Sequence, residues 1–181
     1  MKKTITIIFV LAFLTITAQD YNQKVKPEKG QEFLVGPVTL EGLQQAPYKT
    51  WYDTSYESYQ VDESLVKMIG KKLKGYNLKL FLGTWCGDSK REVPRMVKIL
   101  ESAKYPIKEL ELITLDRRKE FYKKSPGGEE KGWNIIKIPT LIVLKDGKEI
   151  NRIVESPIAS LEEDLLAILS TNSYTPNYSS N

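Results

Sequence analysis

The single cysteine of this 181-residue sequence is the residue best suited to chemistry. It lies in the run Trp85-Cys86-Gly87-Asp88-Ser89, between a short apolar stretch and a segment with helical periodicity. A thiol at the start of a helix meets unpaired backbone N–H groups and the positive end of the helix dipole, which both favour the nucleophilic thiolate. The alternative is an inert buried cysteine. Its polar neighbours, and its place after a predicted strand where α/β sheets bind ligands, favour a nucleophile.

The composition excludes several other kinds of chemistry. The sequence contains no histidine, so a His-based triad, a Cys–His pair and an imidazole-ligated metal or haem are excluded. One cysteine allows neither an internal disulfide nor a Cys-rich zinc site. The net charge of +4 falls to +2 without Lys2 and Lys3 of the predicted leader, which is too small to indicate a nucleic-acid partner. No metal and no cofactor are expected, and Asp88 is interpreted as an acid of a helix first turn rather than a metal ligand.

The first 18 residues have the pattern of a secretory signal peptide. Lys2 and Lys3 precede an apolar run over residues 5–16, and Ala18 follows it. The alternative, a membrane anchor, is disfavoured because a spanning helix needs about 20 apolar residues. We therefore expect an exported chain, periplasmic or extracellular, with no membrane contact after cleavage. An unpaired thiol in an oxidising compartment is unusual, which adds interest to Cys86.

The regions that flank the predicted domain are polar or aromatic. Residues 19–60 form a polar lead-in followed by an aromatic extension, which we expect to fold over the domain; the alternative is an aromatic binding surface. Residues 171–181 are rich in Ser, Thr, Asn and Tyr and predict a flexible tail.

The elements that position Cys86 follow from periodicity and turn signals. The predicted helices cover 62–74 (capped by Asp62), 86–104 (with Pro94 inside), 117–124 and 159–169. The predicted strands cover 78–83, 109–116, 141–144 and 149–154, the last two joined by an Asp146-Gly147 turn. Residues 125–132 are predicted to be a loop. Strands that alternate with helices and then form a hairpin predict an α/β three-layer sandwich with a mixed central sheet.

Two segments together resemble the thioredoxin superfamily. The first is Phe81-Leu-Gly-Thr-Trp-Cys-Gly-Asp-Ser, followed by Pro94, and the second is Ile138-Pro139-Thr140, followed by a strand and the turn Lys145-Asp146-Gly147. In that family a Trp-Cys-x-x-Cys motif opens the first long helix, a proline eight residues later kinks it, and a cis-proline faces the cysteine. The resemblance covers residues 61–170. It implies a thioredoxin-like three-layer α/β/α sandwich with an N-terminal extension.

The resemblance also implies a role for individual residues. Cys86 would be the attacking thiol, with Ser89 beside it in a monothiol Cys-x-x-Ser motif. A cis bond before Pro139 would aim the backbone of Ile138 at an extended substrate segment. The residues expected to line this groove are Trp85, Gly87, Asp88, Ile138 and Pro139.

The sequence departs from the family pattern at positions that affect the mechanism. Ser89 replaces the second cysteine: its hydroxyl can hydrogen-bond a thiolate but cannot attack a mixed disulfide. The buried acid and lysine of the family correspond to Leu80 and Leu112. Glu155 stands where the family often has glycine, and its charge would oppose the thiolate.

Two hypotheses follow from these residues. The first is monothiol thiol–disulfide exchange through Cys86, of mixed-disulfide or isomerase type, with protein or low-molecular-weight thiols and disulfides as partners. The second is a catalytically silent thioredoxin-fold module that binds a partner through the groove or the aromatic extension. Cluster binding by one thiol per subunit and thiol peroxidase activity are ranked below both. The sequence carries no signal of oligomeric state.

Overall fold

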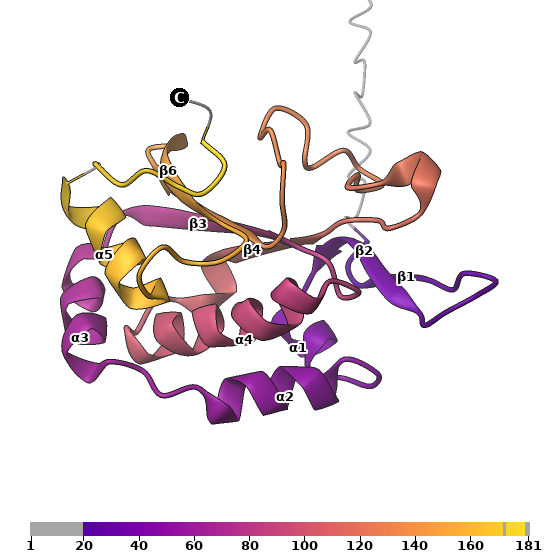
Figure 1. The fold of residues 1–181 in the computed structure, drawn as a ribbon, viewed down its shortest axis with the longest axis horizontal. Coiled ribbons are helices and arrows are strands. Elements are labelled where there is room, and N and C mark those ends of the chain that lie inside the picture. Colours follow the sequence, from indigo (N-terminus) through magenta and orange to yellow (C-terminus); the bar gives the residue numbers. More distant parts are fainter. Residues whose placement is uncertain (1–19, 172, 180–181) are drawn as a thin grey trace, which may run out of the picture.

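A six-stranded mixed sheet forms the centre of the computed structural model, which describes residues 20–171 and 173–179 (Figure 1). The predicted signal peptide, residues 1–18, lies outside the described residues. The strands are β1 (Gln23–Val25), β2 (Phe33–Val38), β3 (Tyr76–Leu82), β4 (Leu110–Thr114), β5 (Thr140–Lys145) and β6 (Lys148–Val154). Their spatial order is β1-β2-β4-β3-β5-β6, with β3 and β4 parallel and every other neighbouring pair antiparallel.

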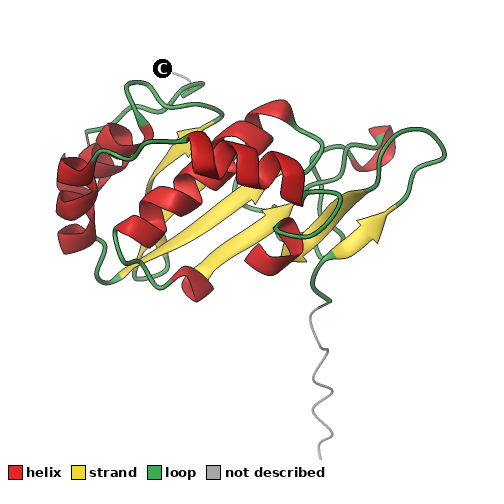
Figure 2. Ribbon diagram, turned by 90° about the horizontal axis from the view of Figure 1, so that it is seen from below, coloured by secondary structure: helices red, strands yellow, loops and turns green. Residues whose placement is uncertain are grey.

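The five α-helices of the described residues lie on one face of this sheet (Figures 1 and 2). They are α1 (Leu40–Leu43), α2 (Lys49–Ser58), α3 (Glu63–Lys72), α4 (Gly87–Ser102) and α5 (Leu161–Thr171). Alternation along β3 turns Leu78, Leu80 and Leu82 toward this helical layer, where they join the larger of two hydrophobic clusters. No helix in residues 20–171 is long and apolar enough to cross a membrane.

The other face of the sheet is covered by the connection between β4 and β5 instead of by a long helix. Phe81 of β3 and Ile113 of β4 belong to a second cluster on this face, and Trp133 and Ile135 of the connection pack against it. The third layer of the sandwich is therefore residues 116–139. A short 3₁₀-helix, η2 (Lys119–Phe121), is the helical element within it.

The predicted helix over 117–124 is wrong, because Asp116 organises these residues as a closed loop. The buried Asp116 carboxylate accepts the backbone N–H of Arg118 at 2.7 Å, and the Arg118 guanidinium pairs with it at 2.6 Å. The Asp116 N–H donates to the Lys124 carbonyl, and the Lys123 N–H donates to the Asp116 carbonyl, both at 2.9 Å. These bonds replace the i to i−4 bonds of a helix.

The remaining elements around the cysteine agree with the sequence. Asp62 caps α3 by accepting the backbone N–H groups of Ser64 and Leu65, both at 2.9 Å. Asp146 and Gly147, with φ of 51° and 74°, form the turn between β5 and β6. Two left-handed residues in a two-residue turn match the twist of a hairpin.

The aromatic extension is an integral part of the helical layer. Tyr48 and Tyr52 are buried, and the hydroxyls of Tyr56 and Tyr59 donate to Glu101 and Glu162, each at 2.6 Å. These tyrosines therefore point inward and join the N-terminal segment to the rest of the fold.

Residues 173–179 lie against β6 and the start of α5. The Tyr174 hydroxyl donates to Asp164 at 2.7 Å, and Asn177 donates to the Ser156 carbonyl at 2.9 Å. The Tyr174 carbonyl accepts from Asn151 of β6. This part of the chain shields the outer side of an edge strand.

Candidate thiol site

Cys86 is the N-cap residue of α4 and lies at the end of β3. Its N–H donates to the Gly83 carbonyl at 2.9 Å, which closes the turn between strand and helix, and Leu34 N–H of β2 donates to Thr84 Oγ1 at 3.0 Å. The Cys86 side chain is half-buried. Cys86 therefore stands at the N-terminal end of a 16-residue helix, and its side chain makes no capping hydrogen bond to the first N–H groups.

The segment before β5 faces this sulfur. The Ile138–Pro139 peptide bond is cis, and both residues are buried. The Cys86 thiol donates to the Ile138 carbonyl, with 3.5 Å between Sγ and O. The neighbouring Pro139 carbonyl accepts the Glu155 N–H at 2.7 Å. The structure thus brings together Cys86 and the two residues predicted to oppose it.

Trp85 forms one wall beside the thiol. Its Nε1–H donates to the Leu115 carbonyl at 2.8 Å, and its ring lies at 6.0 Å, centroid to centroid, from the ring of Tyr122. Gly83 makes this arrangement possible. A Cβ at that position would lie 2.8 Å from the Ile138 side chain and 2.9 Å from the Trp85 ring.

Ser89 lies under the site rather than in it. Its side chain is fully buried, and its hydroxyl accepts the Gly83 N–H at 3.1 Å. Within the described residues it makes no hydrogen bond to the Cys86 sulfur. The serine therefore supports the turn that carries the cysteine.

The other two predicted residues of the first turn lie at its surface. Gly87 is exposed, and the Asp88 carboxylate pairs with Arg91 of the next turn at 2.8 Å. Asp88 is thus placed as a first-turn acid. In the described chain no group of three or more His, Cys, Asp or Glu residues is arranged to hold a metal ion.

Lys123 is a site residue that the sequence does not reveal, because the charged run around it predicts a helix over 117–124. Its ammonium donates to the Ile136 carbonyl, two residues before the carbonyl that receives the Cys86 thiol. Burial and the nearby Lys137 lower the pKa of Lys123, while the charges of Glu155 and Cys86 raise it. A cation therefore lies within electrostatic range of the sulfur.

The charge of Glu155 is compensated in the structure. Lys137 pairs with its carboxylate at 3.1 Å, and the Tyr178 hydroxyl donates to the other oxygen. The hydrogen bond from Tyr178, together with Lys137, lowers the pKa of Glu155. Lys137 therefore offsets the negative charge of Glu155, which was expected to disfavour a thiolate at Cys86.

An apolar pair, Leu80 and Leu112, lies in the sheet before the turn that carries Cys86. Leu80 and Leu112 are direct partners in the β3–β4 register, and both are buried in the larger cluster. No ionisable side chain takes part in this pair.

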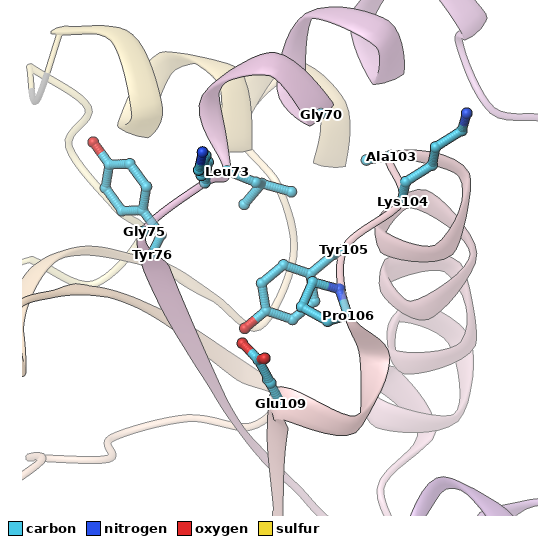
Figure 3. Close-up of a pocket in the computed structure, with 10 residues that line it drawn as sticks. Gly70, Leu73, Gly75, Tyr76, Ala103, Lys104, Tyr105, Pro106 and Glu109 are labelled. Atoms are coloured by element: carbon cyan, nitrogen blue, oxygen red, sulfur yellow. The ribbon is translucent and has the colours of Figure 1, made fainter.

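A separate pocket of about 320 Å³ lies at the other end of β3 (Figure 3). It is lined by Leu73 after α3, Tyr76 at the start of β3, and Lys104 and Tyr105 after α4. Cys86 lies after the C-terminal end of β3 and directly before the N-terminal end of α4. The pocket is therefore not part of the thiol site.

Three solved structures are similar to this chain. A crystal structure of a Pseudomonas aeruginosa protein of unknown function is similar at 17% identity with a TM-score of 0.50, covering 69% of this chain and 85% of that one. An HIV epitope scaffold is similar at 18% identity, with a TM-score of 0.48 and coverage of 69% and 86%. Oxidised mitochondrial thioredoxin 3 of Saccharomyces cerevisiae is similar at 25% identity, with a TM-score of 0.32 and coverage of 55% and 86%.

A search of the curated proteins finds no match. The model of a family described as thioredoxin matches residues 40–166, a region that contains α1 to α4, the cysteine turn and the cis-proline. The match extends well before residue 61, in agreement with the packing of α1 and α2 on the helical layer. The chain therefore belongs to the thioredoxin superfamily.

Proposed function

We propose that this chain is an exported monothiol thiol–disulfide exchange protein that acts through Cys86. The observation that carries the proposal is the half-buried sulfur at the N-terminus of α4, held 3.5 Å from the carbonyl of Ile138. A helix N-terminus and a neighbouring cation both stabilise a thiolate, and partial exposure lets a disulfide reach it. Export rests on the pattern of residues 1–18.

The proposed reaction is an exchange without net oxidation. The Cys86 thiolate attacks one sulfur of a partner disulfide, a Cys86–partner S–S bond forms, and the second partner sulfur leaves as a thiolate that takes up a proton. Release requires a further thiol, either the partner's own or a low-molecular-weight thiol. It attacks the partner sulfur of the mixed disulfide and returns the Cys86 thiolate.

Ser89 determines the form of this cycle. A second thiol in its place would displace the partner from within the chain, and a serine hydroxyl has no such reactivity. The cycle therefore supports isomerisation or removal of small thiols from proteins, with release by an outside thiol.

A binding role for the same groove is the competing function. Its support is the Leu80–Leu112 contact, which puts hydrocarbon where the superfamily has a polar pair. The two functions differ in what they require of the sulfur. Exchange is lost in Cys86→Ser, whereas groove binding is retained.

The decisive experiment follows the thiol directly. With 2,2′-dithiodipyridine at about pH 6, Cys86 should react about tenfold faster than a model peptide thiol, and the Cys86→Ser variant should release no thione. Alkylation of cells that express the wild type should yield mixed disulfides that Cys86→Ser lacks. A Ser89→Cys variant should resolve them and gain dithiol reductase activity. Equal rates for Cys86 and the model thiol, with no trapped species, would refute exchange.

A further inference from the structure

Residues 116–124 form a rigid loop beside Cys86 that presents aromatic and basic side chains to solvent. We call it the aromatic–basic loop. Its ends are closed by the two backbone bonds between Asp116 and the pair Lys123–Lys124, and the buried Asp116–Arg118 pair fixes its interior. A loop held in this way offers its side chains in a fixed arrangement, which lowers the entropic cost of binding a partner.

Three large apolar side chains of this region are exposed. Phe121 is 49% exposed, Tyr122 52% and Ile136 42%, although all three are large hydrophobic residues. Tyr122 stacks obliquely on Trp85, the residue before Cys86, and Ile136 is bound to the loop through the Lys123 ammonium. Apolar side chains left exposed together on a folded domain mark an interaction surface.

The same surface is strongly basic. The loop carries five cationic side chains, Arg117, Arg118, Lys119, Lys123 and Lys124. Its two carboxylates are those of Asp116, which forms an ion pair with Arg118, and Glu120. Lys119 and Lys124 are exposed, and within the described residues neither forms an ion pair. The loop therefore presents uncompensated positive charge next to the aromatic rings.

We infer that the aromatic–basic loop docks an acidic segment of the protein whose disulfide Cys86 attacks, with an apolar side chain of that segment seated on Phe121 and Tyr122. Charge complementarity identifies the occupant: a loop that carries exposed, unpaired cations and contacts Trp85 beside the sulfur attracts an acidic chain and repels a basic one. The contact of the loop with Trp85 places such a segment beside the sulfur. The inference rests on the proposed exchange function and names its substrate class.

A pair of activated peptides tests this assignment. Each peptide carries one cysteine as a mixed disulfide with 2-thiopyridine, flanked by Leu and either four Asp or four Lys residues. The Cys86 thiolate attacks the peptide sulfur, forms the Cys86–peptide disulfide and releases 2-thiopyridone, which is followed by absorbance. At low salt the acidic peptide should react about tenfold faster than the basic one, and about 0.5 M salt should remove most of the difference.

Variants locate the effect in the loop. The double variant Lys119→Glu, Lys124→Glu should invert the ratio of the two rates, and Phe121→Ser should lower the rate with the acidic peptide. The control Lys67→Glu, Lys71→Glu makes the same charge change on the exposed side of α3 and should keep the wild-type ratio.

Three outcomes separate the claims. Equal rates with both peptides, while the wild type reacts normally with 2,2′-dithiodipyridine, would overturn the docking assignment and leave exchange intact. Failure with dithiodipyridine as well would overturn the proposed function itself. Equal peptide rates, with binding to phosphatidylserine vesicles that the Lys119→Glu, Lys124→Glu variant loses, would reassign the loop to an anionic lipid surface.

Discussion

At the scale of single residues, the site is a sulfur with one backbone partner and an apolar bed. Cys86 donates to the Ile138 carbonyl and packs against the second hydrophobic cluster, and the Lys123 ammonium supplies a positive charge nearby. The cation is anchored through the Ile136 carbonyl, so its position relative to the sulfur is fixed by the backbone. The proposed exchange function would therefore use Lys123 to balance the charge of a thiolate at Cys86.

Replacement of Lys123 tests this role. Lys123→Gln should slow alkylation of Cys86 by iodoacetamide about three- to tenfold at about pH 6.5, because the thiolate loses a nearby cation. Lys123→Arg should restore most of the rate, since the charge returns. Lys71→Gln removes the same charge at an exposed position of α3 and serves as the control. Identical rates for Lys123→Gln and the wild type would contradict a charge role for this residue.

At the scale of elements, tyrosines at the start of α2 and within it have raised pKa values, and one of them, Tyr56, joins α2 to Glu101 of α4. Burial, followed by the hydrogen bond to Glu101, raises the pKa of Tyr56 to about 12, and burial raises the pKa of Tyr48 to about 12. The unfolded chain loses these protons near pH 10. The folded state therefore binds more protons between pH 10 and 12. Its stability is complete below pH 10 and falls as the pH rises through that interval.

Alkaline unfolding gives a direct measurement of this linkage. The free energy of unfolding in urea should fall between about pH 9 and about pH 11.5, and it should fall less in Tyr56→Phe, which has no proton to lose. Tyr21→Phe, at an exposed position, should follow the wild type. If Tyr56→Phe lost stability as steeply as the wild type, the α2–α4 contact would not be the source of the pH dependence.

At the scale of the whole molecule, the end of the chain completes the fold. Tyr174 satisfies the buried Asp164, which also accepts the N–H groups of Ile158 and Ala159 at 2.7 and 3.2 Å before α5. The residues around Tyr174 cover β6, an edge strand of the sheet. Their removal would expose both an acid network and a strand edge.

A chain that ends at residue 172 should accordingly melt about 3–8 °C lower than the full chain, through loss of these hydrogen bonds. It should also scatter more light on heating, because β6 is uncovered. Tyr174→Phe removes a single hydroxyl and should cause a smaller decrease without added scattering. An unchanged melting temperature in the truncated chain would show that the tail contributes no stability.

Local signals predicted the central part of the fold well. Asp62 as a helix cap and Asp146-Gly147 as a hairpin turn act within a few residues, so the sequence displays them directly. The strand β2 is different, because all six of its residues are buried and show no alternation, and its partner β4 is far along the chain. Such a strand is identified by its partner rather than by its own pattern.

The candidate site was predictable where motifs identify it. Cys86 and the opposing Ile138 and Pro139 followed from their motifs. Lys123 and Tyr122 did not, because their approach to Cys86 depends on the closure of residues 116–124 by the Asp116 carboxylate. The charged run over residues 117–124 predicts a helix, but the hydrogen bonds of the buried Asp116 close it into a loop.

The two hydrophobic clusters lie on opposite faces of one sheet, and this separation bears on how related chains diverge. The helix after Cys86 is seated on one cluster, whereas the aromatic–basic loop belongs to the layer over the other. Substitutions of exposed side chains in that loop leave the seating of the helix untouched. Trp85 and Cys86 pack against the second cluster, so a change in the length of the loop would reach the sulfur, whereas a change of an exposed side chain would not.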